Sequence, residues 1–364
     1  MSSEKNNFYI TYKEIYHNRY LYSKNEKKDA KYLIKKNLRE CKIGKNDIKN
    51  LKVLNVGTGR ESFAFIDLKV KECQLVDLSN KTKIKAKIFK KKHKNFYFQI
   101  NDLCKKNLSL KKFNFLYLNG VFHHLNNPTN ALINILKNSE TGSKFFFRIY
   151  RSGSSKFYAV DYIRKFLKIN NYKKFEKIFL RKFNISKKKM KYDLSHQNPM
   201  IHFYEMCVDN FFVPHLNLFN INNFIKVFKL CGLKLIFKSK SQNYNHSNSE
   251  KDNTGISLAF EKSGKVKIPN KFKFVNDDQL SDISYKEKYI LDSNKLFIKF
   301  LPKIKNFQEN KRINLAIDLL LITQGHRILK YYNVKKEYKY LKLQSSPKKI
   351  HLAIQSRLKQ EFSV

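Results

Sequence analysis

The feature that most constrains this chain is an apolar run that ends in a tight glycine turn. Residues 51–62 read Leu-Lys-Val-Leu-Asn-Val-Gly-Thr-Gly-Arg-Glu-Ser, which is typical of a buried strand, a turn and the start of a helix. A second apolar stretch ends at Asp77, twenty residues after Gly57. This spacing predicts a nucleotide-type cofactor bound at the edge of an α/β sheet.

Strand-like and helix-like segments alternate after this turn, with short connections between them. Predicted strands cover residues 53–56, 74–76, 96–100, 115–118, 144–150, 233–238 and 255–260, and predicted helices cover residues 60–68, 81–92, 128–137 and 222–230. Such alternation favours an α/β fold with a doubly wound, mostly parallel sheet.

Composition divides the chain into three parts. Residues 1–50 predict N-terminal helices, residues 45–262 carry the α/β pattern, and residues 263–364 predict a mainly helical C-terminal extension. Within the middle part, residues 151–214 are rich in Lys, Phe and Tyr and predict a helical insertion. We expect this insertion to form a lid over the sheet edge. The C-terminal region is expected to extend the lid or to contact a second copy of the chain.

The formal net charge of +46 is a weak argument for a nucleic-acid partner, because lysine greatly outnumbers arginine and is spread along the chain. Asn, Ile, Phe and Tyr are also abundant, a joint bias that an AT-rich coding sequence produces. The five cysteines include no CxxC pair, which argues against a disulfide framework and favours a reducing cytoplasm. The polar N-terminus does not look like a signal peptide, and no apolar stretch is long enough to cross a bilayer.

Two further motifs narrow the choice of cofactor. Asp102 follows the third predicted strand, and the fourth leads into Asn-Gly-Val-Phe-His-His-Leu at residues 119–125. Together with the glycine turn and Asp77, these motifs resemble the class I S-adenosylmethionine-dependent methyltransferases over residues 45–262. The resemblance implies a seven-stranded Rossmann-like sheet and S-adenosyl-L-methionine as the cofactor.

The resemblance also implies which residues face the cofactor. In that family the glycine turn holds the methionine portion, and the acid after the second strand binds the ribose. The acid after the third strand meets the adenine amino group, and the segment after the fourth strand lines the site near the sulfonium. The matching positions are Asn55, Val56, Gly57, Thr58, Gly59, Asp77, Leu78, Asp102, Leu103, Asn119, Gly120, Val121 and His124. Two positions depart from the family pattern, because Asn55 replaces the usual acid and Glu61 stands where a third glycine is usual.

Residues that could act on the methyl acceptor lie further along the chain. The candidate general bases are His123, His124 and His215; for His123 and His124, a role in shaping the cofactor pocket is the alternative. The candidate acceptor-binding residues are Tyr150, Arg151, Asp209 and His215, which follow the fifth strand or interrupt an apolar run with polar groups. No tight ligand spacing is present, and no metal site is predicted.

The sequence therefore predicts a cytoplasmic methyltransferase that acts on a small or medium organic acceptor at oxygen, nitrogen or carbon. One alternative is an RNA methyltransferase that holds the polyanion on its basic surface. This alternative is less favoured, because no recognisable RNA-binding module and no Asn-Pro-Pro-Tyr motif are present. The other alternative is a non-catalytic protein that binds the cofactor or acts as a scaffold. A homodimer is compatible with each of these readings.

Overall fold

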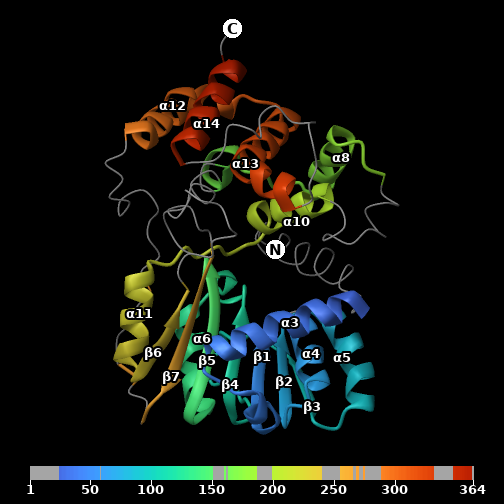
Figure 1. Cartoon of the computed structure of the whole chain (residues 1–364). Helices are drawn as coiled ribbons and strands as arrows, with labels where there is room; N and C mark the ends of the chain where they lie inside the picture. The colour runs from blue at the N-terminus through green and yellow to red at the C-terminus, as the bar shows by residue number, and fades with distance from the viewer. Residues whose placement is uncertain are drawn as a thin grey trace.

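The structure is a computed structural model with two layers (Figure 1). The first layer is a sheet with flanking helices, and the second is a group of helices at one end of that sheet. It describes residues 24–57, 59–150, 160, 163–186, 199–239, 255–264, 268–269, 274, 288–331 and 347–362. Part of the predicted N-terminal helical region lies outside these residues. The first helix described is α3 (Lys24–Glu40).

A seven-stranded sheet forms the centre of the first layer, in the order β3-β2-β1-β4-β5-β7-β6. Its strands are β1 (Lys52–Val56), β2 (Glu72–Asp77), β3 (Phe96–Ile100), β4 (Phe113–Asn119), β5 (Ser139–Tyr150), β6 (Leu233–Lys238) and β7 (Gly255–Lys262). Strands β1 to β5 pair in parallel, whereas β7 runs antiparallel to both β5 and β6. The prediction of a mostly parallel, seven-stranded α/β sheet is confirmed.

Helices cover both faces of this sheet, as expected for a doubly wound fold. Successive residues of β5 point to opposite faces, so Phe145 and Phe147 join one buried cluster and Phe146 joins the other. The helices that pack on the Phe146 face are α3, α4 (Arg60–Asp67) and α5 (Asn80–Lys92). Those on the opposite face are α6 (Pro128–Asn138) and α11 (Ile221–Leu230).

Local signals in the sequence set the ends of two of these helices. The Asn127 side chain accepts a hydrogen bond from the Asn130 backbone N–H at 2.9 Å, and Pro128 occupies the first helical position of α6. Helix α11 ends just before Gly232, whose φ of 83° lies in the left-handed region. The chain can therefore turn directly from α11 into β6.

Strand β5 is longer than expected, because the prediction started it at residue 144 and it begins at Ser139. The additional residues, Ser-Glu-Thr-Gly-Ser, are polar and lack the pattern of a buried strand. They join the sheet through an irregular register against β4, where Ser139 pairs with Phe113 and the Ser143 hydroxyl donates to the Phe113 carbonyl at 3.0 Å. The start of β5 is therefore set by pairing with β4, which residues 139–143 alone do not predict.

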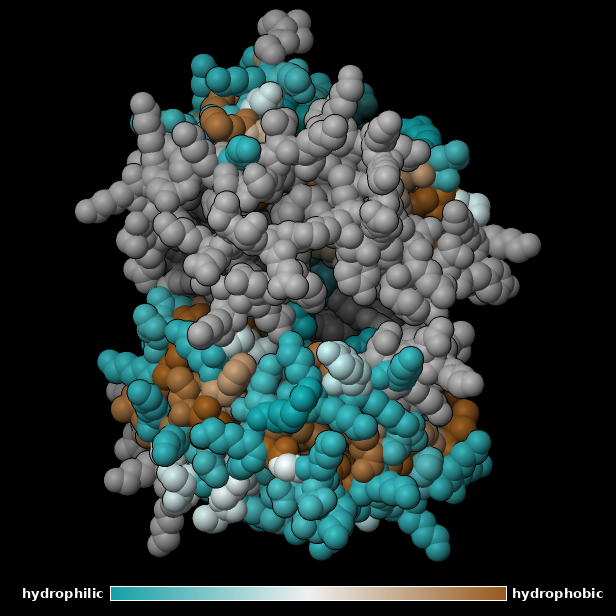
Figure 2. All heavy atoms as spheres, in the orientation of Figure 1, coloured by the Kyte–Doolittle hydropathy of each residue, from teal (hydrophilic) through white to brown (hydrophobic). Residues whose placement is uncertain are grey.

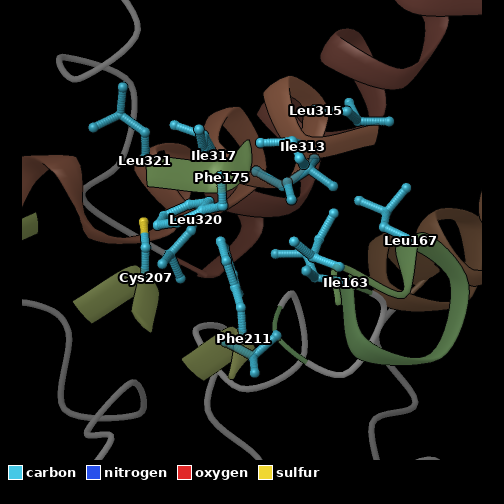
Figure 3. Packing of buried hydrophobic residues seen from close by; sticks show 14 of the residues in the cluster. Ile163, Leu167, Phe175, Cys207, Phe211, Ile313, Leu315, Ile317, Leu320 and Leu321 are labelled. Carbon is cyan, nitrogen blue, oxygen red and sulfur yellow. The ribbon is translucent and has the colours of Figure 1, made fainter. Parts of the chain in front are cut away.

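The second layer combines helices from the predicted insertion and from the C-terminal region. Its elements are η4 (Ile163–Leu167), α8 (Tyr172–Lys182), α10 (Pro199–Phe211), α12 (Lys288–Lys305), α13 (Glu309–Tyr331) and α14 (Pro347–Phe362). They share one hydrophobic core, in which Phe175 and Phe211 lie among Ile317 and Leu320 of α13 (Figure 3). The two segments are distant in sequence but pack as one layer.

Hydrophilic side chains cover much of the visible face of the sheet layer, with hydrophobic patches between them (Figure 2). All five cysteines are buried. Among the described helices, none has the length and apolarity that crossing a membrane requires. In the same part of the chain, no group of three His, Cys, Asp or Glu side chains is arranged to hold a metal ion.

Candidate functional site

The glycine turn after β1 brings the backbone close to two neighbouring strands. Gly57 and Gly59 have φ values of 127° and 90°, which residues with a Cβ rarely adopt. A Cβ at Gly57 would lie 3.1 Å from Val121 Cγ2, and one at Gly59 would lie 3.1 Å from Leu75 Cδ2. The turn therefore requires glycine for both conformation and space. Val56 ends β1 immediately before it, and Thr58 lies outside the described residues.

The two positions that depart from the family pattern are both accommodated locally. The Asn55 amide donates to the Ser62 hydroxyl at 2.8 Å, and both side chains are buried, so Asn55 ties β1 to α4. Glu61 is mostly buried, and its carboxylate accepts a bond from the Arg60 guanidinium at 3.0 Å. These contacts explain how the turn is held without the usual acid and third glycine.

Asp77 ends β2 beside this turn, and its carboxylate accepts two hydrogen bonds from the residues that lead into α5 and from its first turn. Oδ1 accepts from the Ser79 backbone N–H at 2.8 Å, and Oδ2 accepts from the Thr82 hydroxyl at 3.1 Å. Only 7% of Asp77 is exposed, and burial raises the pKa of its carboxyl to about 7 in spite of these hydrogen bonds. The adjacent Leu78 is 38% exposed, unusual for an apolar side chain at the end of an inner strand.

Asp102 lies next to Asp77, because the Asn101 backbone N–H donates to the Asp77 carbonyl at 2.9 Å. The Asp102 carboxylate accepts from the Cys104 backbone N–H at 2.8 Å and shapes the loop after β3. Leu103 is buried in the core, and its carbonyl accepts from the Asn134 side chain at 2.8 Å. Of the two residues predicted here, Asp102 is the one whose side chain is partly accessible.

The end of β4 provides open space opposite the glycine turn. Asn119 is the last strand residue, and Gly120 follows with a φ of 78°. A Cβ at Gly120 would have no heavy atom within 4 Å. Val121 then approaches Gly57, so the loops after β1 and β4 meet at the same edge. This is the carboxyl edge of the parallel strands, where ligands bind in doubly wound folds.

His123 is fully buried and packed against the end of β5. Its ring stacks on Tyr150 with 3.7 Å between centroids, and its Nδ1 accepts from the Tyr150 backbone N–H at 3.3 Å. Accepting this bond requires Nδ1 to be unprotonated. A ring with no exposed surface gives an acceptor molecule no access, so the geometry favours the packing role for His123 over general base catalysis.

His124 joins the sheet edge to the helical layer. Its Nδ1 lies 3.1 Å from the His215 carbonyl oxygen, and its Nε2 lies 3.4 Å from Oδ1 of Asp209 on α10. The other carboxylate oxygen of Asp209 accepts from the Tyr150 hydroxyl at 3.1 Å. Four of the predicted acceptor-side residues therefore come together, although His215 contributes its backbone carbonyl to this cluster. Arg151 lies outside the described residues.

A carbonyl oxygen can only accept, so His124 Nδ1 must carry a proton. The contact between Nε2 and the carboxylate is then attractive only if a second proton lies on Nε2 or on Asp209. Both ring nitrogens of His124 therefore face oxygen atoms, one on the His215 carbonyl and one on the Asp209 carboxylate.

Sequence reasoning missed Arg164, whose guanidinium donates to three backbone carbonyls at the end of α10 and just after it. Composition offered a weak signal, because arginine is rare beside lysine in this chain and its planar, forked donor suits several acceptors at once. The guanidinium groups of Arg60 and Arg357 instead bind carboxylates, those of Glu61 and Asp318.

A family model described as methyltransferase domain matches residues 26–237. Among solved structures, the chain is similar to the N-methyltransferase NodS from Bradyrhizobium japonicum WM9 in complex with S-adenosyl-l-homocysteine, with 10% identity over 62% of this chain and 86% of that one, and a TM-score of 0.35. It is also similar to 1,6-didemethyltoxoflavin-N1-methyltransferase from Burkholderia thailandensis, with 10% identity over 66% of this chain and 79% of that one, and a TM-score of 0.38. No curated protein matches the sequence. Because the family model covers more than half of the residues, the chain belongs to the methyltransferase domain family, whose methyl donor is S-adenosylmethionine.

Proposed function

We propose that this protein transfers a methyl group from S-adenosylmethionine to a small or medium organic acceptor at oxygen, nitrogen or carbon. The observation that carries the proposal is the meeting of the glycine turn, Asp77 and Gly120 at the carboxyl edge of β1, β2 and β4. A methyltransferase needs its donor held at this edge, within reach of residues that follow β4 and β5.

The residues present suit this donor. Gly57 and Gly59 let the backbone turn tightly between β1 and α4, and a Cβ added at Gly120 would have no heavy atom within 4 Å. The first backbone N–H groups of α4 suit the donor's carboxylate. Asp77 suits the ribose hydroxyls, since each carboxylate oxygen can accept more than one bond. The remaining proposed contacts are Asn55, Val56, Thr58, Leu78, Asp102, Leu103, Asn119, Val121 and His124.

When bound, S-adenosylmethionine supplies a methyl group on a positively charged sulfur, which a nucleophile displaces in line. The contribution of this chain is to hold the acceptor in place and to exclude water. The helical layer over the sheet edge, linked to it through Asp209, supports such a lid role. We assign acceptor binding to Tyr150, Arg151, Asp209 and His215, with Asp209 as the group that can take up a proton from the acceptor.

The proposal is tested by isothermal titration calorimetry with S-adenosylhomocysteine, followed by incubation of the protein with methyl-labelled donor and an extract of its own cells. A labelled small molecule is the expected result. Label in RNA, in a manner that depends strongly on salt, would replace the proposed acceptor with the polyanion. Binding without any labelled product would leave the non-catalytic alternative, and absence of binding would refute a donor site at this edge.

A matched pair of glycine variants isolates the site from general effects on the backbone. Gly120 and Gly142 have nearly equal φ values, 78° and 75°, and an added Cβ would meet no atom within 4 Å at either position. Alanine at each position therefore carries similar backbone strain. Only Gly120 lies at the proposed site, so loss of S-adenosylhomocysteine affinity in Gly120→Ala alone supports the assignment.

A further inference from the structure

We infer that Arg164 is a positioning residue for the proposed methyl transfer, acting through the segment that joins α10 to α11. The catalytic role of Arg164 rests on the proposed function. Its effect on the position of this segment can be measured without an assay of methyl transfer. We call residues 209–219 the bridging segment; it comprises the last turn of α10 and the residues between this helix and α11.

Arg164 holds the bridging segment from the side of the helical layer. It lies on the single turn η4, and its Nη1 donates to the Asn210 carbonyl at 3.0 Å. Its Nη2 donates to the carbonyls of Val213 and Pro214, at 2.9 and 3.3 Å. One planar side chain therefore contacts three carbonyls within five residues of chain.

These carbonyls need an outside donor because of where they lie. Helix α10 ends at Phe211, and the last carbonyls of a helix have no donor within the helix. A cation at this end is also favoured by the helix dipole. The carbonyls of Val213 and Pro214 belong to the turn that follows. A guanidinium suits this task better than an ammonium, since its donors are fixed in a plane and reach several acceptors together.

The opposite side of the bridging segment contacts the sheet edge. Asn217 donates from its backbone N–H to the His123 carbonyl at 2.7 Å and from its side chain to the Leu125 carbonyl at 2.7 Å. The Phe219 backbone N–H donates to the Tyr150 carbonyl at 3.2 Å. The His215 carbonyl and the Asp209 carboxylate hold the two ring nitrogens of His124, as described above.

The bridging segment therefore lies between Arg164 and the residues after β4 and β5. If the guanidinium is removed, three carbonyls lose their donor and the segment can shift relative to the sheet. His124 would then lose the fixed partners on both nitrogens, although Arg164 is not among them. Arg164 thus governs the orientation of the acceptor-side cluster through the main chain.

The test compares Arg164→Lys and Arg164→Gln with the control Arg181→Ala, which removes an exposed arginine from the last turn of α8. Histidine side-chain NMR reports whether His124 keeps N–H signals on its ring nitrogens, and hydrogen exchange reports the protection of the Asn217 and Phe219 amides. In both Arg164 variants we expect the His124 ring signals to broaden or disappear and amide protection to fall at least tenfold. The control should match the wild-type protein, and circular dichroism should show an unchanged fold in all variants.

Unchanged His124 signals and unchanged amide protection in whichever Arg164 variant folds would overturn the inference. The outcome is independent of methyl transfer. Calorimetry with S-adenosylhomocysteine separates failure of this inference from failure of the proposed function. The Arg164 variants should bind this ligand within about twofold of wild type. If the proposed donor site is wrong, neither the wild-type protein nor any variant should bind it. Once an acceptor is known, the Arg164 variants should lower kcat while leaving KM for the donor unchanged.

Discussion

Replacing Asp77 with asparagine should stabilise the protein and weaken donor binding at the same time. The carboxyl is 7% exposed, and burial raises its pKa from 3.8 to about 7. A folded-state pKa above the unfolded value means that the folded protein binds the proton more tightly between pH 4 and pH 7. Stability is therefore lost as the pH rises through this window, by an amount on the order of 4 kcal/mol at 1.36 kcal/mol per pH unit.

Asparagine removes this charge while keeping partners for Ser79 and Thr82. Its Oδ1 can accept from the Ser79 N–H, and its amide can donate to the Thr82 hydroxyl in place of the present bond. The free energy of unfolding of Asp77→Asn should exceed that of wild type by a margin that grows from pH 4 to pH 7 and is constant above. Urea titrations followed by circular dichroism at a series of pH values measure this margin.

The same variant should lose donor affinity, because a charged acceptor of two ribose hydroxyls becomes neutral. Hydrogen bonds to charged groups contribute about 1.5–3 kcal/mol, which corresponds to a roughly tenfold to hundredfold increase in Kd for S-adenosylhomocysteine. Asp67→Asn is the control, since Asp67 pairs with Lys31 on the outer helices. A stability margin independent of pH would refute the burial argument, and an unchanged Kd would mean that Asp77 does not bind the ribose.

Three further predictions concern single contacts. Ser62→Ala leaves the buried Asn55 amide without its 2.8 Å partner and should cost about 1–3 kcal/mol in urea unfolding; a smaller loss would mean that the amide finds another acceptor. Asp209→Asn removes the counter-charge of His124 and should reduce single-turnover methyl transfer at least tenfold while donor affinity changes less than twofold; equal loss of both would place Asp209 at the donor instead. Burial lowers the pKa of His351 from 6.5 to about 4, so stability should fall by about 3 kcal/mol as the pH drops from 6.5 to 4, and His351→Gln should remove that fall; an identical pH profile would contradict it.

The sheet could be predicted because each strand carries its own signal. The runs that end at Val56 and Asp77 are apolar enough to be buried on both faces, and Asn127, Pro128 and Gly232 mark helix ends through local chemistry. The start of β5 was missed since residues 139–143 become a strand only by pairing with β4. A local sequence pattern therefore predicts a helix or strand that its own residues determine, and misses one that depends on pairing with a distant strand.

The candidate site could be predicted in position but not in the partners of each side chain. Asp77 was expected at the edge, yet its raised pKa depends on burial by residues far away in sequence. His124 was expected near the donor, but its proton arrangement depends on Asp209 and the His215 carbonyl. These contacts join residues that are far apart in the sequence, and no repeating pattern of residue types predicts which of them meet.

The shared core of the second layer has a consequence for how the chain folds during synthesis. Phe175 of α8 and Phe211 of α10 pack in the same core as Leu358 and Phe362 of α14, which the ribosome makes much later. Ion pairs also link these distant helices, since Asp318 of α13 binds both Lys182 of α8 and Arg357 of α14. Until α14 emerges, the apolar faces of α8 and α10 remain partly uncovered and prone to aggregation. Helices α8 and α10 should therefore depend on chaperones until the last helix has been translated.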